Sequence, residues 1–146
     1  MVRSRLTSAD AFETAPPTVV VLVAGLAGVL GSYGVSGFTT GFVVAPVEAT
    51  LSQLMPGAVV TFAILVLGDI GHQLNLLFAA LSVAGAYAAL VWFAYALGRR
   101  GPRWPAVLGA ATLVWVATAT VTLRPRPAVG AGLAVAGVLA VAELAA

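Results

Sequence analysis

Four long apolar runs constrain this chain more than any other feature, and most of the arginines lie in the two short segments between the last three runs. They cover residues 18–38, 73–97, 105–123 and 128–146. A helix needs about 20 apolar residues to cross the hydrocarbon core of a bilayer, so each run is long enough to span it. Charged residues make up only 8% of the chain, against about a quarter in soluble domains. The sequence therefore predicts an all-α integral membrane protein with about four transmembrane helices, and excludes a soluble domain or a nucleic-acid-binding protein.

The first run follows a short polar stretch. Residues 1–17 end in Pro16-Pro17, which discourages a helix from continuing into the apolar run. That run is longer than the apolar core of a secretory signal peptide, and no small-residue cleavage site follows it. We expect a cytoplasmic tail over residues 1–17 and a single membrane domain over residues 18–146.

The segment 39–72, between the first two spans, is too polar and too rich in proline to be one crossing. Pro46 and Pro56 bracket a stretch with amphipathic helical spacing, and proline suits the first turn of a helix and the position beyond its end. The apolar face of that stretch comprises Val47, Leu51, Leu54 and Met55. The apolar run 57–67 would reach only about 16 Å as a helix, roughly half of the hydrocarbon core. We expect an external interfacial or re-entrant helical segment here.

The arginines predict the orientation. With four crossings, five arginines lie at the end of the bundle that holds the N-terminus, and two, Arg124 and Arg126, lie at the other. Because basic residues collect on the cytoplasmic side, both termini are expected in the cytoplasm and the segment 39–72 outside. If residues 57–67 formed a fifth crossing, the division would be four to three and the C-terminus would lie outside. The charge distribution favours four crossings.

The densest polar group in the apolar part is the stretch GDIGHQLN, residues 68–75. Asp69, His72 and Gln73 from this stretch, with Glu48, form the candidate polar or docking cluster. Ionisable groups at membrane depth tend to serve function, so one interpretation is proton handling or contact with a quinone. The interpretation we favour is structural: Asp69 caps a helix, while the neighbouring polar side chains, and Glu48 on its own helix, face interfacial water.

The sequence offers little for catalysis. The chain has no cysteine and one histidine, which excludes thiolate metal sites, histidine clusters and bis-histidine haem ligation within one chain. No Ser-His-Asp set, pair of catalytic carboxylates, phosphate-binding loop or dinucleotide fingerprint is recognisable. We predict no catalytic residue, cofactor or metal site in this chain, and do not expect an enzyme.

Small residues mark two of the predicted spans as packing elements. Without side chains, glycines allow helix backbones to approach closely, which is how helices associate in lipid. The first span has glycine at every third position: Gly25, Gly28, Gly31, Gly34 and Gly37. The last span carries a small face of Gly132, Ala136 and Ala140. We expect packing within one chain, with a homo-oligomer formed through these faces as the alternative.

The stretch from Val44 to Leu77, which contains PVEATLSQLMPGAVVTFAILVLGDIGHQLNLL, follows the glycine-rich first span. Four features of this stretch form one pattern. They are the bracketing prolines Pro46 and Pro56, the Phe62-Ala63-Ile64 segment, the Leu67-Gly68-Asp69 turn and the long span that follows. This pattern resembles the membrane-embedded N-terminal region of prokaryotic sulfite-oxidase-like molybdopterin-dependent oxidoreductases. The resemblance covers about the first two thirds of the chain.

The resemblance implies a membrane anchor or docking module for an extracytoplasmic molybdopterin domain, as either a truncated product or a free-standing relative of a separately encoded enzyme. That family holds molybdenum through a cysteine thiolate, which this chain lacks, so no catalytic residue is carried over. A small transporter or channel component, oligomeric through the glycine faces, is the alternative from another class. A haem or quinone membrane subunit is a third hypothesis.

Overall fold

The computed structural model describes residues 18–98 and 103–145. The predicted tail 1–17, the loop residues 99–102 with Arg99 and Arg100, and Ala146 lie outside the described residues. The described part is helical apart from its short connections, of which 37–43 is the longest, and contains no strand. Its elements are α2 (Thr18–Ser36), α3 (Val44–Leu54), α4 (Gly57–Phe62), the π-helix η1 (Ala63–Leu67), α5 (Asp69–Leu97), α6 (Arg103–Thr122) and α7 (Pro125–Ala145).

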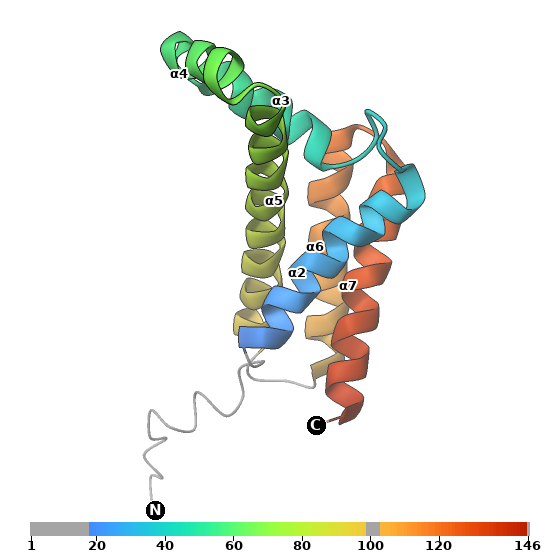
Figure 1. Cartoon of the computed structure of the whole chain (residues 1–146). Coiled ribbons are helices and arrows are strands. Elements are labelled where there is room, and N and C mark those ends of the chain that lie inside the picture. Colours follow the sequence, from blue (N-terminus) through green and yellow to red (C-terminus); the bar gives the residue numbers. More distant parts are fainter. Residues whose placement is uncertain (1–17, 99–102, 146) are drawn as a thin grey trace, which may run out of the picture.

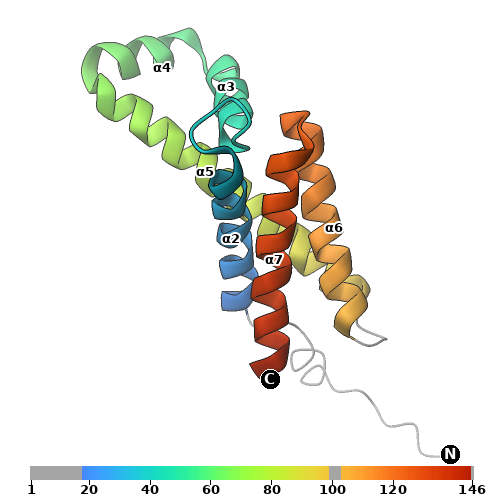
Figure 2. The same ribbon diagram turned by 90° about the vertical axis from the view of Figure 1, so that its right-hand side faces the viewer.

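Four of these helices, α2, α5, α6 and α7, are long and apolar enough to cross a membrane. They form a four-helix bundle in which α2 packs against α5 and α7, and α6 packs against the same two helices on the other side (Figure 1). α2 begins and α7 ends at one end of the bundle, while α3, α4 and the α6–α7 turn lie at the opposite end (Figures 1 and 2). The fold is that of an all-α multi-span membrane protein, as the apolar runs predict.

Two helices begin or end at residues that differ from the predicted bounds, and the cause is local in each case. α2 ends at Ser36 rather than at residue 38, because Gly37 adopts a left-handed φ of +58° and donates its N–H to the carbonyl of Tyr33. α7 begins at Pro125 rather than at residue 128. Its two prolines stop α6 but occupy the first turn of α7, where a missing N–H costs no hydrogen bond.

The second span starts earlier than predicted. α5 begins at Asp69 rather than at residue 73, and its 29 residues reach about 44 Å. That length exceeds the hydrocarbon thickness of about 30 Å. Its N-terminal half leans away from α6 and α7 (Figure 2), so the first turns of α5 are free to contact α3 and η1.

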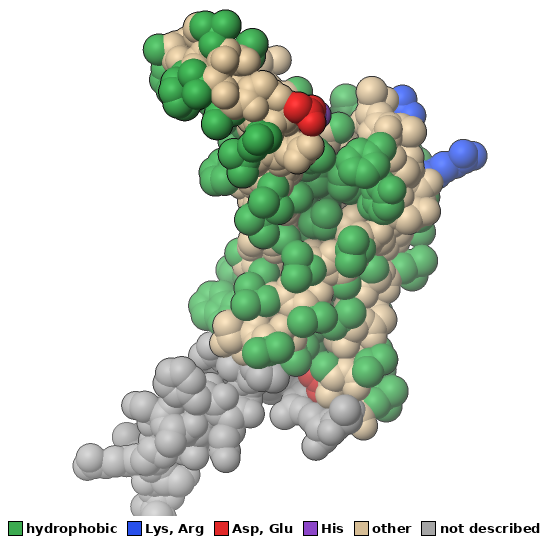
Figure 3. Space-filling view, in the orientation of Figure 1, with side chains coloured by type: hydrophobic (Ala, Val, Ile, Leu, Met, Phe, Trp, Pro, Cys, Tyr) green, Lys and Arg blue, Asp and Glu red, His purple; other side chains and the backbone are tan. Residues whose placement is uncertain are grey.

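Small side chains fill the bundle and large ones cover it. Alanines and valines account for most of the buried positions, including Ala24, Ala79, Ala110, Ala131, Val91 and Val114. Leu22, Leu26 and Leu30 of α2 are exposed, and hydrophobic side chains dominate the visible surface of the bundle (Figure 3). Lipid removes the hydrophobic drive between helices, so such bundles associate through close packing of small residues.

The glycines of α2 contact two different helices in turn. A Cβ added at Gly25 would collide with the Ala84 carbonyl of α5, and one at Gly31 would collide with the Gly130 carbonyl of α7. A Cβ at Gly28, between them, would lie 2.6 Å from Tyr87 and 3.1 Å from Val135. A period of three drifts around a helix with 3.6 residues per turn, so the line of glycines winds from α5 to α7.

Two of the predicted packing glycines do not pack. An added Cβ at Gly34 or Gly37 would meet open space. Gly34 lies on an exposed face of α2, and Gly37 lies beyond its end. On α7, a Cβ at Gly132 would lie 3.2 Å from the Ala111 carbonyl of α6. Ala136 and Ala140 are half-buried. The glycine position of this small face therefore serves the contact between α6 and α7.

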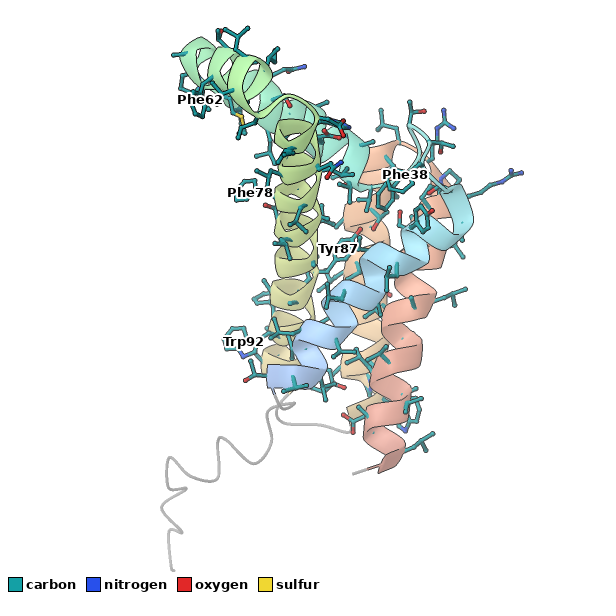
Figure 4. All side chains as sticks on the ribbon, viewed as in Figure 1. Phe38, Phe62, Phe78, Tyr87 and Trp92 are labelled. Carbon is teal, nitrogen blue, oxygen red and sulfur yellow. The ribbon has the colours of Figure 1, made fainter. Side chains whose placement is uncertain are left out.

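Hydroxyl groups within the spans bond to the backbone of their own helix. Thr112, Thr118 and Thr122 each donate to the carbonyl four residues earlier, and Thr120 donates to the carbonyl three residues earlier. Thr118 also shares a hydrogen bond with the hydroxyl of Tyr87, whose side chain lies between the helices of the bundle (Figure 4). This bond ties α5 to α6 in the interior.

Candidate functional site

The segment between the first two spans folds into a helical hairpin, residues 44–67, formed by α3, α4 and η1. Pro46 lies in the first turn of α3, and Pro56 follows its end after an extended Met55. Beyond this break the chain bends by 113°, so that the pair could be a broken span or a re-entrant loop. The hairpin projects from one end of the bundle (Figures 1 and 2).

Part of the apolar face of α3 packs on the bundle. Val47 and Leu51 pack against the core, and Met55 faces a cavity inside the hairpin. Leu54 is 76% exposed, on the part of the apolar face that does not contact the bundle. As the last residue of α3, it lies where the chain turns away from the bundle.

The return from the hairpin to the bundle depends on one glycine. Gly68 separates η1 from α5 with φ +52° and ψ −125°, a combination that side chains disfavour strongly. η1 itself is a π-helix, a form that is rare and frequently found at functional sites. The sharp turn brings η1 back against the first turns of α5.

This turn brings Glu48 of α3 to His72 of α5. The Nδ1 atom of His72 lies 3.2 Å from the Oε1 atom of Glu48, and the Glu48 side chain is only 18% exposed. The expectation that Glu48 faces solvent is therefore wrong. Helix α3 turns Glu48 toward α5 because Val47 and Leu51, on the adjoining part of its surface, pack on the bundle. His72 is 67% exposed, as expected of a side chain at the interface.

Asp69 and Gln73 form a separate pair. The Gln73 amide donates to the Asp69 carboxylate over 3.0 Å, one turn apart on α5. The structure contradicts the prediction that Asp69 caps the helix: the N-cap is Gly68, and no side-chain cap hydrogen bond is present there. Asp69 instead occupies the first turn, where its negative charge suits the helix dipole. Both side chains are exposed.

Two further residues complete the cluster. The Asn75 Nδ2 group lies 3.0 Å from Ser52 Oγ and 3.4 Å from Glu48 Oε1. Ser52 was missed in the sequence, although it lies four residues after Glu48 and so on the same face of α3, just as Asn75 lies three residues after His72 on α5. We call the whole set the polar seam: Glu48, Ser52, Asp69, His72, Gln73 and Asn75.

A cavity of about 380 Å³ lies inside the hairpin, between α3, η1 and the first turns of α5. Its polar wall is the inner part of the seam, formed by Glu48, Ser52, His72 and Asn75. The remaining lining is mostly apolar and includes Val60, Ala63, Leu67 and Phe78. In Figure 4, Phe62 on the hairpin and Phe78 on α5 lie on the same flank of the molecule.

The other polar side chains lie elsewhere. At the opposite end of the bundle from the hairpin, the Tyr95 hydroxyl donates to the Glu143 carboxylate over 2.9 Å and links α5 to α7. Arg124 and Arg126 lie at the hairpin end, beside a hollow of about 440 Å³ next to the α6–α7 turn. Among residues 18–98 and 103–145, no three His, Asp or Glu side chains gather as a metal site would require.

Comparisons of the chain with protein families, with curated proteins and with solved structures found no match. The class of protein is therefore defined by the fold alone, an all-α membrane protein with four helices long enough to span.

Proposed function

We propose that this chain is a membrane anchor or docking module for an extracytoplasmic, sulfite-oxidase-like molybdopterin domain, with no catalysis of its own. The partner class comes from the resemblance of residues 44–77. The observation that carries the docking role is the exposed part of the polar seam. Asp69, His72 and Gln73 lie on one face of the first turns of α5, where the hairpin meets the bundle.

The surface around these residues favours docking at the membrane boundary. The hairpin exposes large apolar side chains, including Phe62, Ile64, Leu65 and Val66, which suit the lipid or its interface. Acidic and histidine side chains gather at the joint between hairpin and bundle (Figure 3). A partner domain above this end of the bundle would meet charged and amide groups framed by apolar surface.

The bundle interior gives the transporter alternative less support. Fully buried Leu139, Val114 and Val135 fill the space between the helices, and the polar side chains Tyr87 and Thr118 satisfy each other there. Intramembrane ionisable residues typically mark transport pathways, whereas Glu48, Asp69 and His72 all lie in the hairpin or at its joint.

The proposal is tested by recruitment in cells. A tagged sulfite-oxidase-like molybdopterin-domain protein is co-expressed with this chain, and its membrane-bound fraction is measured by flotation. We expect the triple variant Asp69→Ala, His72→Ala, Gln73→Ala to lower that fraction at least fivefold while the chain inserts normally. Ser82→Ala is the matched control, since Ser82 is also exposed on α5 but bonds only to its own helix.

Two outcomes would contradict the docking role. One is equal recruitment by the triple variant and the Ser82→Ala control. The other is ion flux through liposomes that contain only this chain, which would move the transporter class into first place.

A further inference from the structure

The hollow beside the α6–α7 turn carries an inference that does not depend on the docking role. It has a volume of about 440 Å³ and lies between the end of α2, with the loop that follows, and the start of α7. α2 ends at Ser36, α6 ends at Thr122 and α7 begins at Pro125, so three candidate spans end around it. The ends of spans lie where the apolar core of a bilayer meets its headgroups. The hollow is therefore expected at the level of the lipid phosphates.

The hollow is basic. Arg124 and Arg126 both line it, and the described residues of its lining include no Asp or Glu. Among residues 18–98 and 103–145, no acidic side chain forms an ion pair with either arginine. α7 begins between the two arginines, and the N-terminal end of a helix carries partial positive charge. These cations therefore favour an anionic ligand.

Of the described side chains that line the hollow, the two arginines have hydrogen-bond donors to spare. The Thr39 hydroxyl donates to the Ser36 carbonyl, and the Ser36 hydroxyl donates to the Ser32 carbonyl, so neither hydroxyl has a proton left for a ligand. A guanidinium presents five N–H donors in a planar fork that matches the oxygens of a phosphate. At the level of the headgroups, the anionic group that fits these donors is a lipid phosphate.

The backbone on both sides of the hollow is held in place. The Thr122 hydroxyl oxygen accepts the backbone N–H of Arg124 over 3.3 Å, and Pro125 and Pro127 restrict the chain beyond it. A Cβ added at Gly41 would lie 3.5 Å from the Arg124 Cδ and 3.6 Å from the Pro127 Cγ. The stem of the Arg124 side chain therefore lies beside the loop that follows α2, and a side chain at Gly41 would enter the hollow.

Apolar surface continues from the hollow along the bundle. Val129 and Leu133 lie three and seven residues after Arg126, on the same face of α7, and both are exposed. Val35 lines the hollow and is also exposed, and a Cβ added at Gly130 of α7 would lie 2.6 Å from its Cγ2. In Figure 3, arginine side chains stand at this end of the molecule beside hydrophobic surface. A ligand held by its phosphate in the hollow can therefore lay a hydrocarbon chain on the bundle.

We propose that this hollow binds the headgroup of an anionic phospholipid. The guanidinium groups of Arg124 and Arg126 bind the phosphodiester, and an acyl chain lies along Val35 and Val129. A zwitterionic lipid brings the same phosphate together with an ammonium group, for which the described lining offers no acidic partner. Free phosphate shares the chemistry of the headgroup but has no chain to lay on the apolar surface.

The test identifies the lipid beside the hollow. The chain has no cysteine, so Leu133→Cys accepts a single bimane fluorophore on the exposed side of α7. The full chain is reconstituted in vesicles that mix phosphatidylcholine with a minority of phosphatidylglycerol, and quenching is measured with one or the other lipid brominated on its chains. We expect at least threefold enrichment of phosphatidylglycerol beside the fluorophore, because basic pockets between spans bind anionic headgroups. The reference position is Leu81→Cys on α5, which is also exposed and should show no enrichment.

Two variants, made in the Leu133→Cys background, locate the site. Arg124→Gln combined with Arg126→Gln removes both cations and should abolish the enrichment. Gly41→Leu fills the hollow, changes no charge and should also abolish it. If Gly41→Leu fails to fold, the arginine variant still decides the result.

The matched control is Arg99→Gln combined with Arg100→Gln. It removes the same charge from the loop between α5 and α6, and the enrichment should stay unchanged. An excess of inorganic phosphate, compared with chloride at equal ionic strength, should also leave it unchanged if the site holds a lipid.

Five results would each overturn the proposal. They are equal quenching by the two lipids, equal enrichment at the reference position, enrichment that survives the arginine variant or a folded Gly41→Leu, equal loss in the loop control, and displacement by inorganic phosphate. The last result would assign the hollow to a soluble anion instead.

Discussion

The bundle and the hairpin are both helical and both apolar, yet they are held in opposite ways. In the bundle, α2 and α7 approach so closely that Gly31 and Gly130 each leave no room for a Cβ of the other. In the hairpin, α3 and η1 stand apart around a cavity, and α3 is linked to α5 by polar side chains. Close backbone packing gives a rigid element, whereas a polar link across a cavity leaves space that a ligand or partner can use.

The first prediction breaks the bundle at its tightest point and has the largest expected effect. A Cβ at Gly31 would lie 2.6 Å from the Ala134 Cβ and would collide with the Gly130 carbonyl. The neighbouring element there is backbone, which cannot give way as a flexible side chain can. Gly31→Leu should therefore destabilise the protein by about 3 kcal/mol or more, measured by unfolding in detergent.

Gly34→Leu provides the control on the same helix, since an added Cβ at Gly34 meets open space. Leucine favours the helix over glycine by about 0.8 kcal/mol, so this variant should be neutral or slightly stabilised. Similar losses of unfolding free energy in Gly31→Leu and Gly34→Leu would show that the stability of the protein does not depend on the close contact between α2 and α7.

The second prediction concerns the joint between the two regions. Gly68 adopts φ +52° and ψ −125°, where an alanine would be strained by about 2 kcal/mol. We expect Gly68→Ala to raise hydrogen exchange in η1 and in the first turns of α5, and to leave exchange in α6 and α7 unchanged. The control is Gly57→Ala, at the start of α4, where φ is negative and nothing lies near the added Cβ. Faster exchange throughout the bundle would show that hairpin and bundle unfold together.

The two regions also differ in how far the sequence predicts them. The spans can be predicted because lipid selects for long apolar runs, and the four predicted runs each contain most of a helix in the structure. The hairpin break follows from Pro46 and Pro56, whose backbone restrictions are local. Orientation in the membrane depends on the arginines and stays a prediction.

The candidate site is predictable only in part. The polar types of Glu48, His72 and Asn75 are visible in the sequence, but their meeting depends on the turn at Gly68, and no local pattern specifies its direction. The same dependence on tertiary structure explains the error on Glu48, whose helix turns according to where Val47 packs. Likewise, periodicity alone cannot show that Gly34 faces away from the neighbouring helices, although Val35 beside it still lies against Gly130 of α7.

The last and smallest predicted effect tests whether polar links matter inside the bundle as they do in the hairpin. Tyr87 and Thr118 share a buried hydrogen bond between α5 and α6, and Thr118 also donates to its own helix. Tyr87→Phe keeps the ring, whose edge lies beside Gly28, and removes only the hydroxyl. Interhelical hydrogen bonds in membranes contribute about 0.6 kcal/mol on average and at most about 1.7, so we expect the free energy of unfolding to fall by an amount in that range.

Tyr33→Phe is the matched control, because the Tyr33 ring packs on Phe38 and Phe42 but no described residue hydrogen-bonds to its hydroxyl. A loss above about 2 kcal/mol for Tyr87→Phe alone would show that the bundle depends on this hydrogen bond as well as on close packing. Equal losses in both variants would contradict a specific contribution from the bond between α5 and α6.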